Sequence, residues 1–497
     1  MAIETAIRTF KNLIGGEWTE SSSGRTFDSI NPANKTEVVG RFQASVEDDV
    51  VQAIESAEKA FPAWKAVAPS KRAEMLYKAA VLLETGLEQY AEELTREEGK
   101  TLAASRMEVK RSAQTLRYYA SEGLNIAGDT LPSDDPTTFV YTKKEPLGVV
   151  TVITPWNFPI SIPVRKIAPA LASGNTVVFK PASDTPLIAF RLVEALHNAG
   201  LPAGVINFVT GSASKTGVPL VSHPAVKAVT FTGSTGAGEN IRRNVRLSTR
   251  IQMELGGKNP LIVLEDADLD HAVELAVKGG FELTGQACTG TSRVIVMEQV
   301  HDAFVEKLIA RTKTLTIGNG LSGEAEIGPL ANDSQLNNVL DYVAIGQAEG
   351  AELAYGGEWI NEGEYANGYF VRPAIFTGVR PDMRIAQEEI FGPVVSVIRV
   401  KCFKHAIRVA NDVEYGLSAS IVTSDYNRMQ YFIDHIQSGI VKVNRTTTGN
   451  ALNVPFGGLK MSSTATFRES GREALDFYTH SKTVYHGIQE LKFCCSK

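Results

Sequence analysis

The stretch between residues 148 and 234 constrains the fold most, because short β-prone runs alternate there with helical ones. The β-prone runs are rich in β-branched and aromatic residues and span 148–154, 175–181, 204–211 and 228–234. The runs at 161–174 and 187–200 have helical character, and both end in glycine, a common helix terminator. This alternation predicts a parallel sheet covered by helices.

Other segments extend this α/β pattern in both directions. Residues 47–64 and 71–100 have apolar residues near helical spacing, and residues 268–281 form a further expected helix with Asp268 as its N-cap. We expect additional strands at 292–298, 385–400, 419–424 and 439–444, and a β-prone run in the tail. No repeat or long linker divides the chain.

Composition narrows the classes of function. With 497 residues and a net charge of -6, the chain has no cationic face for nucleic acid. It has no secretory signal pattern and no apolar run of membrane-spanning length, so we expect no membrane association and a cytoplasmic location. The four cysteines do not form a disulfide framework, and the eight histidines show no metal-binding spacing, so we expect no metal site.

Cys288 lies in the polar, glycine-containing stretch GQACTG, where a substrate and backbone N–H groups can approach closely. Taken alone it is equally an ordinary buried thiol in a tight turn. Glu254 ends a β-prone run beside two glycines, as a general base can, although most glutamates are simply solvated. Asn157 follows a strand at its carboxyl end, where an amide can donate to an oxyanion, or where it serves only as a turn residue.

Glycines also follow the strand at 228–234. In FTGSTGAGENI, Gly233, Gly236 and Gly238 stand between a strand and a helix, as in a loop that binds the phosphates of a dinucleotide. The spacing is not GxGxxG, so this motif alone is a weak indication.

Seven short motifs occur in order over residues 155–458: PWNFP, NTVVFKPAS, FTGST, ELGGKNP, GQAC, EEIFGP and PFGG. Together they resemble the aldehyde dehydrogenase superfamily, and the likeness covers nearly the whole chain. Within this superfamily, the sequence most resembles the semialdehyde and 2-oxoglutaric semialdehyde dehydrogenase branch. The resemblance implies a Rossmann-like parallel-sheet cofactor domain at 1–130 and 149–256, an α/β catalytic domain at 257–445, and a small β oligomerisation arm at 131–148 and 476–497.

The resemblance also implies roles for single residues. Cys288 matches the nucleophile, Glu254 the general base, and Asn157 the oxyanion donor, together with the backbone N–H of Cys288. The cofactor contacts implied in the same way are Thr154, Pro155, Trp156, Lys180, Ser183, Gly233, Ser234, Leu255, Glu389 and Phe391. The substrate contacts are Phe158, Arg165 and Phe456.

These residue types make chemical sense for the non-acylating oxidation of an aldehyde. A thiolate attacks the aldehyde, an amide stabilises the oxyanion, hydride leaves to a nicotinamide, and a carboxylate activates water to hydrolyse the thioester. The expected function is therefore NAD(P)-dependent oxidation of a small aldehyde, in a homodimer or homotetramer.

Two positions depart from the common family pattern. Ser183 stands where many members carry glutamate, so we expect NADP to be used and NAD also to be accepted. Arg165 stands where others have an aromatic residue, so it either holds a substrate carboxylate or is a surface arginine. Glu282 occupies a position where succinic semialdehyde enzymes tend to have arginine, which argues against that exact substrate.

Four alternatives compete with a semialdehyde dehydrogenase. One is a broad-specificity aldehyde dehydrogenase that acts on aliphatic, aromatic or retinal-type aldehydes. A thiolase-type cysteine acyltransferase needs a histidine base, and no histidine lies in a glycine-rich block. A non-catalytic relative typically lacks the nucleophile or the base. A dehydrogenase that passes the acyl group to coenzyme A is disfavoured by the presence of Glu254.

Overall fold

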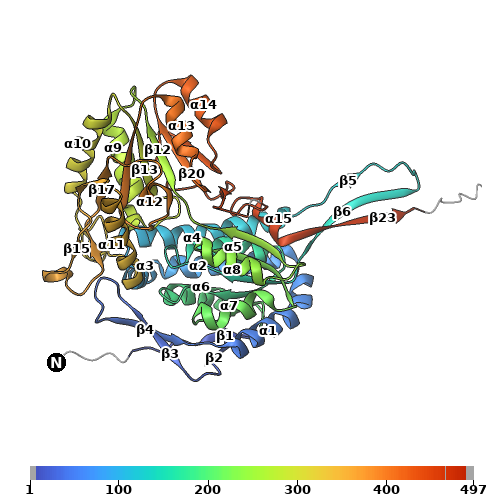
Figure 1. Cartoon of the computed structure of the whole chain (residues 1–497). Coiled ribbons are helices and arrows are strands. Elements are labelled where there is room, and N and C mark those ends of the chain that lie inside the picture. Colours follow the sequence, from blue (N-terminus) through green and yellow to red (C-terminus); the bar gives the residue numbers. More distant parts are fainter. Residues whose placement is uncertain (1–6, 465, 489–497) are drawn as a thin grey trace, which may run out of the picture.

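The structure is a computed structural model that describes residues 7–464 and 466–488. Two seven-stranded sheets form the cores of two lobes, and a small three-stranded arm projects from them (Figure 1). The α/β class expected from the sequence is confirmed. Within the described ranges, no helix is long and apolar enough to cross a membrane.

The first sheet has the strand order β11-β10-β7-β8-β9-β1-β2. Five of its strands run parallel to one another: β7 (Val149–Ile153), β8 (Thr176–Lys180), β9 (Ile206–Phe208), β10 (Val226–Thr232) and β11 (Arg250–Glu254). They include the four strands that the alternating sequence pattern predicted. An antiparallel hairpin of β1 (Asn12–Ile14) and β2 (Glu17–Thr19) completes one edge. Glu254 is therefore the last residue of an edge strand.

Helices cover both faces of the first sheet because each carries an apolar stripe. One face is covered by α1 (Glu47–Ala66), α7 (Ala213–Ser222) and α8 (Thr235–Asn244). On the other face, α5 (Ser161–Ala172) and α6 (Pro186–Asn198) lie against the strands, and α2 (Pro69–Thr85), α3 (Leu87–Glu98), α4 (Leu102–Glu122) and η1 (Gly123–Asn125) pack outside them. The hairpin β3 (Thr26–Ile30) and β4 (Val38–Gln43) adjoins this lobe.

The second sheet has the order β14-β17-β18-β13-β12-β20-β21. Its strands are β12 (Asn259–Val263), β13 (Thr291–Met297), β14 (Glu352–Tyr355), β17 (Ala374–Thr377), β18 (Val394–Val400), β20 (Ser418–Val422) and β21 (Ile440–Val443), and only β14 runs antiparallel to its neighbour. One face packs against α9 (Leu269–Phe281) and α10 (His301–Lys313). The other packs against α11 (Asp333–Ala348), α12 (Arg384–Gln387), α13 (Phe403–Asn411) and α14 (Tyr426–His435).

One predicted strand is shorter than the sequence indicated. The run at 385–400 was expected to be β-structure throughout, but residues 384–387 form α12 and the strand begins at Val394. Phe391 has a positive φ of 57°, and Gly392 and Pro393 follow it, so the backbone turns sharply there. The expected strand at 385–393 is therefore wrong: residues 385–387 belong to α12, and residues 388–393 form a loop.

Shorter elements complete the second lobe and its surroundings. They are η2 (Glu282–Gly285), η3 (Gly363–Tyr365), the pair β15 (Trp359–Ile360) and β16 (Phe370–Val371), and the pair β19 (Tyr415–Gly416) and β22 (Leu459–Lys460).

The arm pairs the two segments that the sequence indicated. β23 (Thr479–Gly487) runs antiparallel to β6 (Thr138–Pro146) over nine residue pairs of the same chain, and β5 (Thr130–Leu131) lies on the other side of β6. Arg250 donates to the carbonyls of Asp476, Phe477 and Thr479, where α15 (Ala474–Tyr478) leads into β23. The arm is thus tied to the first sheet at its base. The last residues of the tail, with Cys494 and Cys495, lie outside the described residues.

Candidate active site

Cys288 lies on a loop between η2 and β13, and hydrogen bonds from the Asn259 side chain to backbone carbonyls hold that loop. The Asn259 side-chain amide donates to the carbonyls of Cys288 and Gly290 at 2.8 and 2.9 Å, and its oxygen accepts from the Ser418 backbone at 2.9 Å. A single side chain at the start of β12 therefore joins the cysteine loop to the second sheet.

The same loop has an unusual backbone. Leu283, Thr284 and Gly285 have successive φ values of 54°, 57° and 70°, in the left-handed region that non-glycine residues rarely adopt. A Cβ on Gly285 would lie 2.1 Å from the Gly392 carbonyl oxygen, so only glycine fits there. The turn after α9 therefore packs closely against the loop that carries Glu389 and Phe391.

The environment of Cys288 favours the neutral thiol. Burial raises the pKa of Cys288 to about 12, and the positive charge of Arg165 opposes this rise. The side chain is half-buried and not disulfide-bonded. A nucleophilic Cys288 therefore needs a base or a bound substrate and cofactor to lose its proton.

Asn157 lies beside the cysteine loop. Its side-chain nitrogen donates to the Gln286 carbonyl at 2.9 Å, which leaves one amide hydrogen available for another acceptor. Its side-chain oxygen is buried and makes no hydrogen bond within the described chain. The amide therefore has the free donor that an oxyanion would need.

Lys100 is a buried cation that sequence reasoning missed, and it binds the backbone of Asn157. The ammonium of Lys100 donates to the Asn157 carbonyl at 2.6 Å and to Glu108 at 2.7 Å, and lies 4.6 Å from the centre of the Phe158 ring. The other carboxylate oxygen of Glu108 accepts from the backbone N–H groups of Ile160 and Ser161. Lys100 and Glu108 thus fix the loop that precedes α5.

Glu254 is buried at the end of β11. Its Oε1 accepts from Gln252 at 3.2 Å, and its Oε2 makes no hydrogen bond within the described chain. Burial, followed by the negative charge of Glu469, raises the pKa of Glu254 well above its usual range, whereas Lys166 and Arg468 oppose the rise. A buried carboxyl group with a raised pKa and an oxygen without a partner among the described residues can exchange a proton with a water molecule beside it.

Lys166 connects Glu254 to Glu469 through a chain of polar groups. Its ammonium is fully buried and lies 2.6 Å from Glu469, 3.0 Å from Thr230 and 3.2 Å from Gln252, which in turn donates to Glu254. Nothing in the sequence pattern distinguishes Lys166 from a surface lysine, because its burial comes from the packing of α5 onto the sheet.

Arg165 is not a surface residue, so that alternative is wrong. Its side chain is 16% exposed, its Nε lies 3.6 Å from Glu469, and its guanidinium lies 5.5 Å from the centre of the Phe456 ring. The backbones of Phe456 and Glu469 pair with each other in both directions. Arg165 and Phe456 are therefore neighbours, and the charge of Arg165 reaches Cys288.

Other candidate residues gather along the carboxyl edge of the first sheet. Burial lowers the pKa of Lys180 to about 8, while Asp184 opposes the shift. The Ser183 hydroxyl donates to the Gly211 carbonyl at 3.2 Å, just before the first turn of α7. Asp184 accepts from the Asn332 side chain at 2.8 Å, so its carboxylate has a fixed partner in the second lobe.

The start of α8 provides a site of the kind that binds phosphate. Ser234 is its N-cap, and its hydroxyl accepts from the Ala237 backbone at 3.4 Å. The backbone N–H of Gly233 donates to the Glu254 carbonyl at 3.2 Å. Gly238 allows Leu255 to pack closely, since a Cβ there would lie 2.7 Å from that side chain. Residues 233–238 therefore lie directly beside the end of β11.

Glu389 approaches the cysteine loop from the second lobe. It accepts from the Gly257 backbone at 2.8 Å, and burial raises its pKa to about 7. Cβ atoms on Gly256 and Gly257 would lie 2.2 Å from Glu389 and 2.6 Å from the Cys288 carbonyl, so both glycines permit this approach. Phe391 meets Trp156 edge-on at 5.5 Å between ring centres, which brings the two lobes together.

These groups fit a nicotinamide dinucleotide. The exposed N-terminal turn of α8 suits the pyrophosphate, while Lys180 and Glu389 suit ribose hydroxyls as donor and acceptor. The buried Thr154 hydroxyl makes no hydrogen bond within the described residues, which leaves a polar group available beside this edge.

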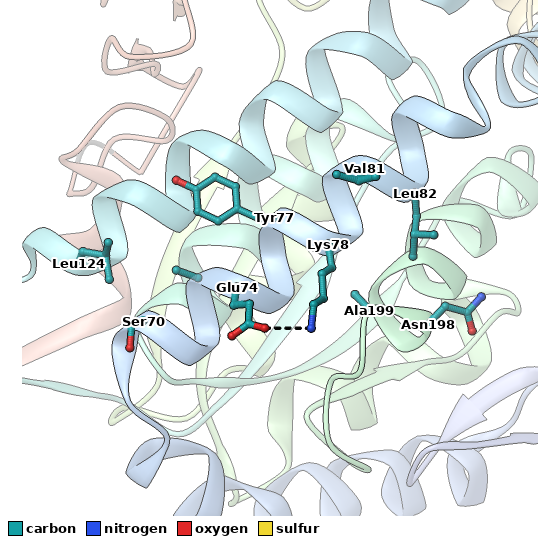
Figure 2. Close-up of a pocket in the computed structure, with 10 residues that line it drawn as sticks. Ser70, Glu74, Tyr77, Lys78, Val81, Leu82, Leu124, Asn198 and Ala199 are labelled. Atoms are coloured by element: carbon teal, nitrogen blue, oxygen red, sulfur yellow. Dashed lines mark ion pairs between the residues drawn. The ribbon is translucent and has the colours of Figure 1, made fainter.

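A hollow elsewhere on the surface contains none of these residues. It has a volume of about 610 Å³ and a largely apolar lining that includes Tyr77, Val81, Leu82 and Leu124, with the Glu74–Lys78 ion pair on its wall (Figure 2). It lies on α2 and the end of α6, so it does not mark the candidate active site.

Comparison with known proteins places the chain in a family. Residues 18–484 match the sequence model of the aldehyde dehydrogenase family. The alpha-ketoglutaric semialdehyde dehydrogenase of Bacillus subtilis is 47% identical over 98% of this chain and 99% of the relative.

Solved structures agree with this likeness. Betaine aldehyde dehydrogenase from Staphylococcus aureus in complex with NAD+ is 35% identical, with a TM-score of 0.94 over 98% of this chain and 96% of that one. An NADP-dependent enzyme of E. coli is 37% identical, with a TM-score of 0.93 over 97% and 98% of the two chains. The chain therefore belongs to the aldehyde dehydrogenase family and is an NAD(P)-dependent oxidoreductase that converts an aldehyde to a carboxylic acid.

Proposed function

We propose that this protein oxidises 2-oxoglutaric semialdehyde, or a closely related aldehyde with an anionic far end. The observation that carries the proposal is Arg165, a largely buried cation that lies against Phe456 and acts electrostatically on Cys288. An uncharged aldehyde has no use for such a cation, which disfavours the broad-specificity alternative. The 47% identity to a semialdehyde dehydrogenase over nearly the whole chain supports the same substrate class.

The proposed reaction starts at the thiol. Cys288 gives up its proton and its sulfur bonds to the aldehyde carbon, while the carbonyl oxygen becomes an oxyanion that accepts from Asn157 and the Cys288 backbone. Collapse of the oxyanion leaves a thioester on Cys288, and NAD or NADP, when bound beside it, would supply the acceptor for the hydride that is lost. Glu254 takes a proton from water as the water attacks the thioester, so the acid is released and the thiol restored. The presence of Glu254 favours water over coenzyme A as the acceptor.

Replacement of the thiol tests its role directly. Cys288→Ala should abolish aldehyde oxidation, because no other group at the site can form the thioester, while binding of NAD or NADP measured by fluorescence titration should persist. The matched control is Cys402→Ala, which removes an exposed thiol and should retain wild-type turnover. Wild-type turnover in Cys288→Ala would overturn the assignment.

Glu254 should serve the hydrolysis of the thioester more than hydride transfer. Glu254→Gln should give a stopped-flow burst of reduced cofactor close to the enzyme concentration and then stall. Because the pKa of Glu254 is raised, the wild-type carboxylate fraction and the deacylation rate should increase as pH rises through that pKa, and this dependence should be absent in Glu254→Gln. A variant with neither burst nor slow phase would instead indicate a role in thiol activation.

We also propose that NADP is used and that NAD is accepted. Ser183 carries no charge that would repel a 2′-phosphate, and its bond to the Gly211 carbonyl places it beside the first turn of α7. Lys215 is exposed in that turn and adds a positive charge that sequence reasoning missed. Asp184 is engaged by Asn332, so its carboxylate has less freedom to replace the missing acid.

Charge at position 183 should decide the choice of cofactor. Ser183→Glu should raise KM for NADP by about tenfold or more, because a like charge that costs about 1.4 kcal/mol is tenfold in affinity, and should change KM for NAD little. Ser183→Ala is the control for loss of the hydroxyl alone. Lys215→Gln should raise KM for NADP roughly twofold to fivefold, as expected for an exposed ion pair. A wild type with no measurable NADP turnover would contradict the proposal.

The domain roles follow the same proposal. Residues 1–130 and 149–256 would form the cofactor-binding domain, 257–445 the catalytic domain, and 131–148 with 476–497 an arm that joins copies of the chain into a homodimer or homotetramer. The nine-residue pairing of β6 with β23 gives the arm a regular exposed edge, and exposed strand edges need a partner.

Truncation tests the arm. A chain that ends at Tyr478 lacks β23 and leaves β6 paired only with the short β5, so it should yield monomers or aggregates in size-exclusion chromatography with light scattering. A control that ends at Ile488 keeps β23 and should retain the wild-type mass. A soluble, active oligomer of wild-type mass after the longer truncation would refute the role of the arm.

A further inference from the structure

Arg111 on α4 lies on the side of that helix which faces α5. Three residues before it, Glu108 accepts from the Ile160 and Ser161 backbones at the start of α5. Four residues after it, Thr115 is buried and donates to the Arg111 carbonyl at 2.9 Å. Residues three and four apart share a helix face, so the Arg111 side chain extends toward the same part of α5 that carries Arg165.

The charge of Arg111 has no counter-ion among the residues that the structure describes. The side chain is half-buried, yet among the described residues it makes no side-chain hydrogen bond, ion pair or aromatic contact. Burial, followed by the positive charge of Arg165, lowers its pKa. Two guanidinium groups on neighbouring helices therefore lie within electrostatic range, and a half-buried cation without a partner is costly unless an anion joins it.

Arg165 shares its counter-ion with Lys166. It lies 3.6 Å from Glu469, and Glu469 is also bound by Lys166 at 2.6 Å. One carboxylate is therefore shared by two cations. The cluster of Arg111, Arg165, Lys166 and Glu469 carries more positive than negative charge, and among the described residues Arg111 is its member without a protein partner.

We propose that Arg111 binds the carboxylate at the far end of the substrate and, with Arg165, makes the enzyme selective for anionic aldehydes. The inference rests on the proposed semialdehyde function and adds a second specificity residue to it. A guanidinium presents two parallel N–H donors that match the two oxygens of a carboxylate, which an ammonium cannot do. Glu469 keeps Arg165 in place, and Arg111 supplies the uncompensated charge.

The test compares two aldehydes of equal chain length, 2-oxoglutaric semialdehyde and pentanal, which lacks both the carboxylate and the 2-oxo group. In Arg111→Gln, the ratio of kcat/KM for the semialdehyde to kcat/KM for pentanal should fall about tenfold to hundredfold, mainly through KM for the semialdehyde, as expected for a lost hydrogen bond to a charged group. Arg111→Lys keeps the charge without the planar fork and should fall between the two. Lys110→Gln removes an exposed charge from the same helix and is the matched control.

Different outcomes test the role of Arg111 and the proposed semialdehyde function separately. If the wild type prefers pentanal, the semialdehyde function itself is wrong. If the wild type prefers the semialdehyde but Arg111→Gln has the same ratio as Lys110→Gln, Arg111 is not a specificity residue and the function still holds. An equal loss on both aldehydes would assign Arg111 a structural role. If Arg111→Gln does not fold, as judged by circular dichroism, Arg111→Lys provides the test. An unchanged ratio of kcat/KM values in Arg111→Lys would show that the planar guanidinium is not needed, and this result would overturn the proposal.

Discussion

The buried ion pair between Lys166 and Glu469 supports most of the site. The ammonium joins β10 through Thr230, β11 through Gln252 and the C-terminal segment through Glu469. Separating either charge would leave the other uncompensated in the interior, which is strongly destabilising. Because the backbone of Glu469 pairs with Phe456, the same ion pair also places the aromatic ring against which Arg165 lies.

The site is divided between two sheets that the chain connects through only four residues. Glu254 ends the first sheet and Asn259 begins the second, and Asn259 holds the cysteine loop. Between them, Gly256 and Gly257 let Glu389 and the Cys288 carbonyl approach to distances that any side chain would block. The short connection therefore brings a carboxyl group and a thiol from separate cores to one place.

The sequence predicted the parts of this arrangement that depend on local pattern. Alternating strand and helix signals located the first sheet, and Glu254 indeed ends one of its strands. The segment at 385–393 was mistaken for a strand because its composition is β-prone, whereas Gly392 and Pro393 end any regular pairing. Lys100, Arg111 and Lys166 could not be identified, since a charged residue in a helix or a loop normally faces water. Their burial depends on which helices pack together, and that is decided by contacts distant in the sequence.

The division of the site between two lobes also affects which amino-acid substitutions the protein tolerates during evolution. The thiol sits on a loop with three successive left-handed residues, and few substitutions are tolerated there. Arg111 and Arg165, in contrast, stand on ordinary helices of the other lobe. On the proposal that Arg111 and Arg165 select the substrate, substitutions at two helical positions would change the substrate and leave the cysteine loop with its reaction intact.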